Sequence, residues 1–241
     1  MGLLLTIDQG NSSAKLVVWN GKEPLLTESH PELSADILGS LARRYGFTRA
    51  IYCSVGEHQE VLAADLAASG IDAVALESLT PTPLSIDYAT PRTLGTDRIA
   101  AAVGAWSLYP GRELLVIDAG TAITYDRVTA DGHFLGGNIA PGIGMRLRAL
   151  HAFTARLPQI STRGELPEWG TTTDTAMRAG AYYGVVGEIT HYKSLLPDGA
   201  LVILTGGWGK ELSEMLNIDI DYQESLVNHG LYHIFEYNEN K

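Results

Sequence analysis

The chain has 241 residues, a formal net charge of −11 and an ordinary globular composition, with 45% hydrophobic and 19% charged residues. These values exclude a disordered or collagen-like chain, and the acidic balance argues against a general affinity for nucleic acid phosphates or anionic membranes. The single cysteine, Cys53, cannot form an intramolecular disulfide and is expected to be buried, and no secretory signal is recognisable at the start. We therefore expect a cytoplasmic protein that binds neither nucleic acid nor a membrane.

Short β-rich segments alternate with longer segments of helical periodicity, which is typical of an α/β protein. In chain order, we predict strands over Leu3–Ile7, Lys15–Trp19, Arg49–Val55, Ala73–Leu76, Glu113–Asp118, Ala122–Val128, Leu201–Leu204 and Leu231–Tyr237. The predicted helices cover Ala35–Tyr45, Gln59–Ala68, Asp97–Tyr109, Ile143–Ala152, Thr173–Leu196 and Lys210–Asn217. A turn at Tyr109–Arg112 separates two predicted halves, residues 1–110 and 111–241.

An internal repeat is the most informative feature of the sequence. The segment Leu4–Ser12 matches Leu114–Ala122, and in each copy an apolar strand ends in aspartate (Asp8, Asp118), followed by a spacer, a glycine and a small polar residue. Such a hairpin can direct backbone N–H groups at a phosphate, while the aspartate can hold a cation. One Asp-x-Gly is also an ordinary turn, but its recurrence in both halves favours a phosphate site.

A third glycine cluster, Gly206–Gly209, follows another predicted strand. It suits close approach of the backbone to a flat ring such as adenine, although a strand-to-helix turn explains it without any ligand. No P-loop, dinucleotide fingerprint, zinc-hydrolase motif or serine-esterase motif is present. His229 and His233 are four residues apart, but Gly230 and the predicted strand Leu231–Tyr237 argue against a shared helical face and a metal site.

The two hairpins and the late glycine turn resemble the acetate and sugar kinase, Hsp70 and actin superfamily. Within it, the sequence is similar to the type III pantothenate kinase family over nearly its whole length. The matching segments are Ile7–Ser12, Tyr88–Pro91, Leu94–Arg98, Val116–Ala122, Gly136–Gly142 and Leu204–Gly207. The resemblance implies an α/β fold of two duplicated ribonuclease H-like halves, the actin-like ATPase fold, with a nucleotide cleft between them.

The same resemblance implies transfer of the ATP γ-phosphoryl to pantothenate, giving 4′-phosphopantothenate, the first step of coenzyme A biosynthesis. It further implies a homodimer with the site at or near the interface, a magnesium ion, and potassium or ammonium. The implied ATP contacts are Asp8, Gln9, Gly10, Asn11, Ser12, Ser13, Ala14, Lys15 and Thr121. The implied substrate contacts are Tyr88, Gly95, Thr96, Asp97, Arg98 and, across the dimer, Thr173. Asp118 would hold the monovalent cation, Asp8 would lie near magnesium, and Asp97 would be the general base.

The residues themselves are compatible with those roles. Phosphoryl transfer needs positioning, charge neutralisation and a carboxylate that accepts the hydroxyl proton. Asp97 lies at the start of a predicted helix, with Thr96 as its candidate cap, and this setting favours a charged carboxylate. Alternatively, the Asp97 carboxylate only complements the helix dipole and has no catalytic role. Arg98 can offer a bidentate fork to a substrate carboxylate, or it can lie on a solvated face.

Some details depart from the family pattern or stay open. Ser12 stands where many members have threonine, and Ser54–His58 replaces the usual Ser-Val-Val-Pro, so no ligand contact is assigned there. Thr173 is chosen by its spacing to Gly180, with Thr171 and Thr172 as alternatives. Two other functions remain open, namely a kinase for another small molecule and a nucleotide-binding regulator without catalysis. The presence of Asp97, Arg98 and both hairpin aspartates argues against the regulator.

Overall fold

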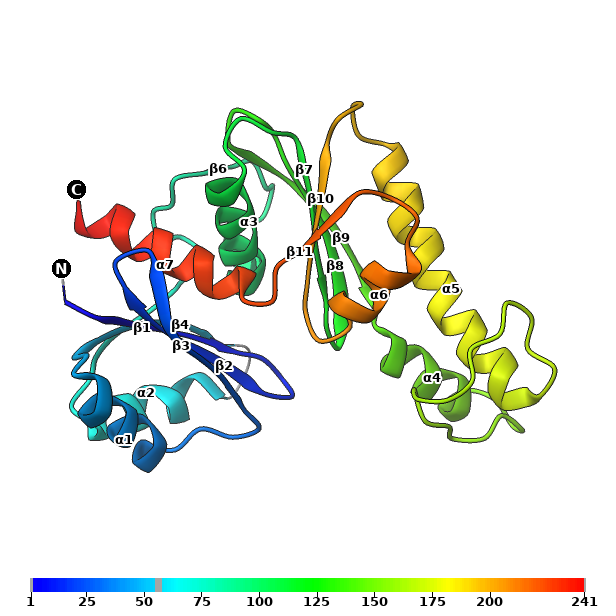
Figure 1. Cartoon of the computed structure of the whole chain (residues 1–241), viewed down its shortest axis with the longest axis horizontal. Coiled ribbons are helices and arrows are strands. Elements are labelled where there is room, and N and C mark those ends of the chain that lie inside the picture. Colours follow the sequence, from blue (N-terminus) through cyan, green and yellow to red (C-terminus); the bar gives the residue numbers. More distant parts are fainter. Residues whose placement is uncertain (1, 55–57, 241) are drawn as a thin grey trace. The chain divides into compact units, whose positions relative to one another are not determined.

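The structure, a computed structural model, describes residues 2–54 and 58–240 (Figure 1). Its contacts divide the chain into two compact units. Unit 1 holds the described residues up to Arg112, Val128–Gly136 and those from Ser225 onward, and unit 2 holds Glu113–Arg127 and Gly137–Glu224. The first break lies beside the predicted boundary at residue 110, but two segments of the predicted half 111–241 pack with unit 1.

Residues 55–57 lie outside the described residues. They include Val55, the end of a predicted strand, and part of the segment that departs from the family pattern. Cys53, at the described end of that strand, is buried as expected, with 2% of its surface exposed. The described part of the chain contains no helix that is long and apolar enough to span a membrane.

Unit 1 is built on a five-stranded sheet in the order β3-β2-β1-β4-β5. Its strands are β1 (Leu4–Gln9), β2 (Ala14–Asn20), β3 (Glu23–His30), β4 (Arg49–Ser54) and β5 (Asp72–Ala75). The first three form an antiparallel meander, whereas β1, β4 and β5 run parallel. Side chains alternate between the faces, so Leu5 and Ile7 enter one apolar cluster while Thr6 and Asp8 point to the opposite face.

Helices cover both faces of this sheet (Figure 1). One face carries α1 (Ala35–Tyr45) and α2 (His58–Ala68), and the other carries α3 (Thr96–Leu108) and α7 (Leu226–Glu239). The Ser34 hydroxyl accepts a hydrogen bond from the Ile37 N–H, and left-handed Gly46 (φ 80°) ends α1. Since Asp8 and the start of α3 share a face, the fold brings two separate motifs together.

The predicted strand Leu231–Tyr237 is wrong, because these residues belong to α7. Its tyrosine, isoleucine and phenylalanine suggested a strand, but the buried side chains of Val227, Leu231 and Ile234 recur every three to four residues, which is the helical period. His229 and His233 therefore do lie one turn apart on one helix. Burial lowers the pKa of both histidines, which disfavours their protonated forms. No cluster of three metal-ligating side chains occurs in the described part of the chain.

The backbones of helices α3 and α7 are in close contact, at a glycine on each helix. A Cβ atom added to Gly230 would overlap the Ala100 carbonyl oxygen and lie 2.5 Å from its carbon, and one added to Gly104 would overlap the Leu226 carbonyl oxygen. We expect Gly230→Ala to lower the free energy of unfolding by about 3 kcal/mol, because neither helix backbone can yield without losing its packing. A urea titration followed by tryptophan fluorescence measures this.

Gly187→Ala is the matched control. This glycine also lies within a helix, but nothing lies within 4 Å of an added Cβ, so alanine should stabilise the protein by up to about 1 kcal/mol. Equal effects of the two substitutions would contradict the close contact between α3 and α7.

Unit 2 repeats the strand order of unit 1. Its sheet is formed by β7 (Leu114–Ala119), β8 (Ala122–Val128), β9 (His133–Pro141), β10 (Leu201–Thr205) and β11 (Ile220–Tyr222). The last residue of β8 and the first four residues of β9 are assigned to unit 1. They neighbour one another in the order β9-β8-β7-β10-β11, with β7, β10 and β11 parallel. This order corresponds strand for strand to β3-β2-β1-β4-β5. The shared topology supports the duplication that the repeated Asp-x-Gly motif suggested.

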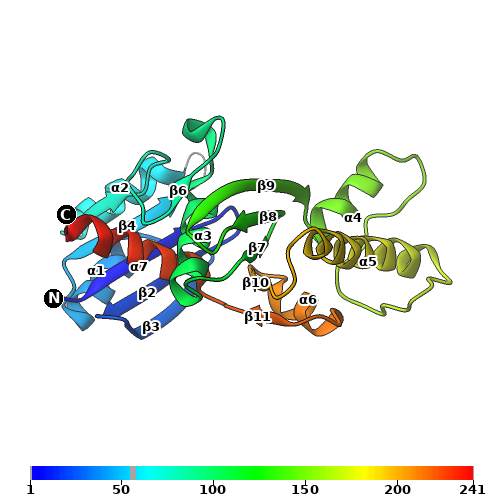
Figure 2. The same cartoon turned by 90° about the horizontal axis from the view of Figure 1, so that it is seen from above.

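The helices of unit 2 are α4 (Ile143–Ala152), α5 (Thr173–Ser194) and α6 (Gly209–Met215), and they share one apolar cluster with the sheet. Figures 1 and 2 both show α4 and α5 side by side. Strands β3, β9 and β11 were not predicted, and neither was the two-residue β6 (Ser85–Ile86), which pairs with the start of β9 inside unit 1. A short 3-10 turn, Pro91–Thr93, precedes α3.

Candidate functional site

The first hairpin presents an exposed polar loop at the end of β1. Gly10–Ser13 connect β1 to β2, and the Gly10 N–H donates to the Ser13 carbonyl at 3.1 Å. The side chains of Asn11, Ser12 and Ser13 are exposed, whereas Ala14 is buried at the start of β2. A short loop with exposed hydroxyl groups and backbone amides is suited to an anion.

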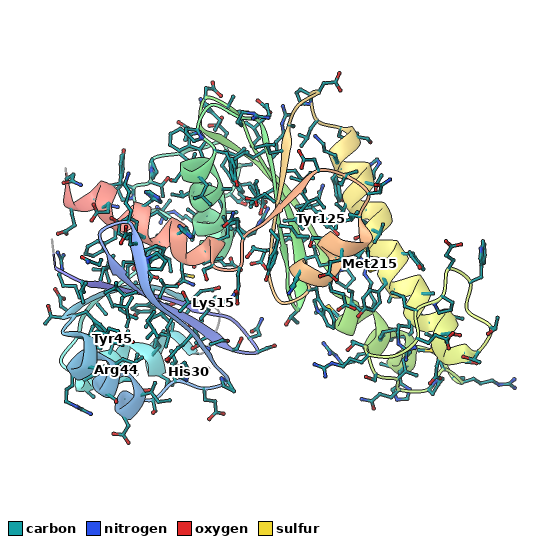
Figure 3. The ribbon with its side chains drawn as sticks, viewed as in Figure 1. Lys15, His30, Arg44, Tyr45, Tyr125 and Met215 are labelled. Carbon is teal, nitrogen blue, oxygen red and sulfur yellow. The ribbon has the colours of Figure 1, made fainter. Side chains whose placement is uncertain are left out.

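Asp8 occupies an electrostatically unfavourable position. Burial raises the pKa of its carboxyl group to about 6, the charge of Asp97 acts in the same direction, and a hydrogen bond from Cys53 and the charge of Lys15 oppose them. The Cys53 thiol donates to Asp8 Oδ1 at 3.6 Å. Lys15, labelled in Figure 3, lies opposite Asp8 in the antiparallel pair. Burial and the charge of Asp97 both disfavour an ionised Asp8, and a bound cation would relieve this.

Asp97 lies in the first turn of α3, as predicted. Gly95, and not the expected Thr96, is the N-cap, because α3 begins one residue earlier, at Thr96, and Gly95 has no side chain to make a capping bond. The backbone N–H of Arg98 donates to Asp97 Oδ1 at 2.9 Å. A Cβ atom on Gly95 would overlap the same oxygen, so the glycine leaves room for this carboxylate.

Arg98 is buried, which rules out the solvated-face alternative. Only 5% of its surface is exposed. Its guanidinium carbon lies 5.7 Å from the centre of the Tyr88 ring and 5.8 Å from that of Phe134. The predicted substrate residues Tyr88 and Arg98 are therefore neighbours in unit 1. Phe134 was not predicted to belong to this group.

The second hairpin, in unit 2, is shorter than the first. Only Gly120 and Thr121 connect β7 to β8, and the Gly120 N–H donates to the Ala122 carbonyl at 3.0 Å. The third glycine cluster lies against it, because the Trp208 N–H donates to the Ala119 carbonyl at 2.9 Å. Gly206 is left-handed (φ 89°), and a Cβ atom there would overlap Asp118 Oδ1. Asp118 is thus enclosed between two glycine turns.

Thr173 is the first residue of α5, one position after its N-cap. The hydroxyl of Thr172 forms a capping box with Thr175, accepting from the Thr175 N–H at 3.2 Å, and is therefore committed to the helix end. Thr173 is exposed. Among the predicted site residues, the structure thus brings Asp8, Lys15, Asp97, Arg98 and Tyr88 together in unit 1, and Asp118 and Thr121 share the second hairpin in unit 2.

Comparison with known proteins identifies the family. A sequence model described as type III pantothenate kinase matches residues 4–194. The type III pantothenate kinase of Porphyromonas gingivalis strain W83 is 43% identical, covering 99% of this chain and 100% of the relative. That of Phocaeicola vulgatus is 41% identical, covering 98% of both chains. The chain belongs to the type III pantothenate kinase family.

Solved structures confirm the fold class predicted for this member of the type III pantothenate kinase family. A Baf family protein from Campylobacter jejuni, proposed as a transcriptional activator, matches with a TM-score of 0.65 at 24% identity, covering 98% of this chain and 100% of that one. A ROK hexokinase from Thermus thermophilus matches with a TM-score of 0.53 at 15% identity, covering 99% and 100%. At these identities the matches concern the fold alone: an α/β ATPase and sugar-kinase fold of duplicated halves.

Proposed function

We propose that the chain transfers the γ-phosphoryl group of ATP to the primary hydroxyl of pantothenate, with Asp97 as the general base. The product would be 4′-phosphopantothenate, and the reaction the first step of coenzyme A biosynthesis, in the cytoplasm. Family membership over the whole chain supports the reaction. The observation that carries the assignment of residues is the grouping of Asp8, Asp97 and Arg98 on one face of the first sheet.

Each residue of this group has a chemical task in the proposed reaction. The transferred phosphoryl group passes through a loose transition state, so the enzyme mainly positions the reactants and compensates charge. The loop Gly10–Ser13 and the ammonium group of Lys15 would hold the phosphates. The Asp97 carboxylate would accept the proton of the attacking hydroxyl, and Arg98 would bind the substrate carboxylate with its fork of N–H donors.

The proposal includes two cations. Asp8 fits magnesium, because burial and a neighbouring carboxylate make its own charge unfavourable until a cation compensates it. Magnesium would neutralise phosphate charge. Asp118 offers a carboxylate oxygen between the second hairpin and Gly206, a hard ligand compatible with potassium or ammonium. Thr121, in the same hairpin, would contact ATP.

We further propose a homodimer with the site at or near its interface, to which Thr173 contributes. Two large apolar side chains of unit 2 support an interface: Phe153, at the end of α4, is 89% exposed, and Trp169, shortly before α5, is 86% exposed. Large apolar side chains as exposed as these are of the kind that a protein interface buries. Light scattering after size-exclusion chromatography would measure the oligomeric state.

A coupled ADP-release assay with ATP, magnesium and pantothenate, run in potassium and in sodium buffer, tests the function. Pantothenate-dependent turnover that requires potassium is the expected result. Turnover in both buffers would support the kinase activity but contradict the role of Asp118 as the ligand of a monovalent cation. Turnover with a sugar in place of pantothenate would favour another small-molecule kinase. No turnover by a folded protein that still binds ATP would favour the regulator.

A further inference from the structure

The guanidinium group of Arg146 links four elements of unit 2. From the first turn of α4, its Nε donates to the Pro141 carbonyl at the end of β9, at 2.7 Å. Its Nη2 lies 2.7 Å and 2.6 Å from the two carboxylate oxygens of Glu188, in α5. The Tyr125 hydroxyl in β8 donates to the same carboxylate at 2.9 Å. Hydrogen bonds in which one partner is charged are about twice as strong as neutral ones, so this network holds the four elements firmly.

This network is largely shielded from water. The side chains of Arg146 and Glu188 are 18% and 33% exposed, and Tyr125, labelled in Figure 3, is 2% exposed. Burial and the hydrogen bond to Glu188 raise the pKa of Tyr125, so its hydroxyl group stays protonated and remains a donor. Gly184, one turn before Glu188, leaves room for the guanidinium, since an added Cβ atom would lie 3.2 Å from Arg146 Nη1. An ion pair in such a place is screened less than one on the open surface.

The carbonyl group that Arg146 holds lies next to the second hairpin. Gly142 follows Pro141, is the N-cap of α4, and donates its N–H to the Thr121 carbonyl at 3.0 Å. A Cβ atom on Gly142 would overlap the Gly120 carbonyl oxygen and lie 2.6 Å from that of Thr121, so the two backbones are in direct contact. Any shift of the junction between β9 and α4 therefore acts on the two-residue turn of this hairpin.

We propose that Arg146 is a positioning residue for the second hairpin, which it holds in the conformation that binds ATP. This inference rests on the proposed function, in which Thr121 contacts ATP. Arg146 acts here through the backbone, because its guanidinium restrains the Pro141 carbonyl and the next residue is bonded to the turn. Without the guanidinium, the junction gains alternative positions, and a misplacement of about 1 Å at a contact can cost much of its advantage. The loss should appear in the affinity for ATP rather than in the chemical step.

Arg146→Met tests this, with Arg127→Met as the matched control. Methionine keeps an apolar stem but cannot donate a hydrogen bond. Arg127 also forms an ion pair within unit 2, with Glu113 at 3.2 Å, but at the end of the β7–β8 pair that is remote from the turn. The measured quantity is the dissociation constant for ATP, obtained by calorimetric titration in a buffer with magnesium and potassium. We expect Arg146→Met to raise this constant about fivefold and Arg127→Met to leave it at the parent value.

Kinetics distinguish this role from a general loss of structure. At saturating ATP, Arg146→Met should keep the kcat and the KM for pantothenate of the parent, because bound ATP itself then holds the turn. A purely structural defect would instead lower kcat through the fraction of active enzyme. Arg146→Lys should have an intermediate dissociation constant for ATP, since one ammonium group cannot keep all three bonds of the guanidinium.

Tyr125→Phe serves as a second variant if Arg146→Met does not fold. It keeps the buried ring, removes one bond to Glu188, and should raise the dissociation constant for ATP about twofold. A folded Arg146→Met or Tyr125→Phe protein that binds ATP as the parent does would overturn the positioning role, and so would an equal effect of Arg127→Met. If the parent binds ATP but does not phosphorylate pantothenate, the proposed function fails, while the comparison of ATP affinities still decides the role of Arg146.

Discussion

Asp97→Asn should lower kcat for pantothenate phosphorylation by about 10²- to 10⁴-fold, the usual contribution of a positioned general base. Asparagine keeps the shape of the side chain, and its amide oxygen can still accept the hydrogen bond from the Arg98 N–H, so the start of α3 should be preserved. What it loses is the capacity to take the proton from the attacking hydroxyl. ATP binding should change little, because the substitution removes a base and no phosphate contact.

The coupled ADP-release assay measures this effect, and ATP titration by calorimetry separates binding from chemistry. Asp36→Asn is the matched control, since Asp36 is also an aspartate in the first turn of a helix of unit 1 but is exposed on α1. Its kcat should equal that of the parent. An Asp97→Asn protein with parental turnover would show that Asp97 only complements the helix dipole.

Asp8→Asn should have two opposite effects, losing activity while gaining stability. Turnover should fall by about 10³-fold, because a magnesium ligand beside the phosphates supplies several kcal/mol of charge stabilisation. The metal-free protein, in contrast, should become more stable at pH 8 by at most about 3 kcal/mol, since burial and the Asp97 charge disfavour an ionised Asp8. Activity and stability are thus opposed at this position.

The pH dependence of that gain follows from the raised pKa. The pKa of Asp8 rises from 3.8 to about 6 on folding, so between these values the folded parent binds the proton more tightly than the unfolded chain. The stability of the parent therefore falls as the pH rises through this window, whereas Asp8→Asn avoids that loss. The two proteins should be equally stable below pH 4, and their difference should reach its full size above pH 6. Urea titrations in a chelating buffer at several pH values measure it. A constant difference at all pH values would point to lost packing instead.

Local sequence signals predicted the elements that position the site. The first strand and both hairpin aspartates were found because a buried apolar run ends at a polar turn, a pattern that depends on few residues. Strand β9 was missed, since Gly136, Gly137 and Pro141 lower its local β propensity, and its pairing with β6 and β8 compensates for this. Helix α7 was taken for a strand for the converse reason, because its aromatic and β-branched residues outweighed its helical spacing.

The predicted site residues of unit 1 are together, but their environments could not be read from the sequence. Buried Arg98 has the rings of Tyr88 and Phe134 beside it, and no local sequence pattern connects these three positions. The hydrogen bond from Cys53 to Asp8 likewise joins two parallel strands. The family resemblance supplied roles for individual positions. It could not supply the neighbouring Phe134, which lies outside all of the matching segments.

The closing of the first sheet by α7 has a consequence for protein synthesis. The Thr6 hydroxyl in β1 donates to the side-chain oxygen of Asn228 in α7 at 2.8 Å, across 222 residues of chain. Trp19 Nε1 donates to the same hydroxyl at 2.9 Å. Between the emergence of α3 and that of α7 the ribosome adds more than a hundred residues, which takes on the order of ten seconds. Throughout that interval one face of the first sheet lacks the part of its cover that α7 provides, so the nascent chain exposes a surface to which chaperones can bind before unit 1 is complete.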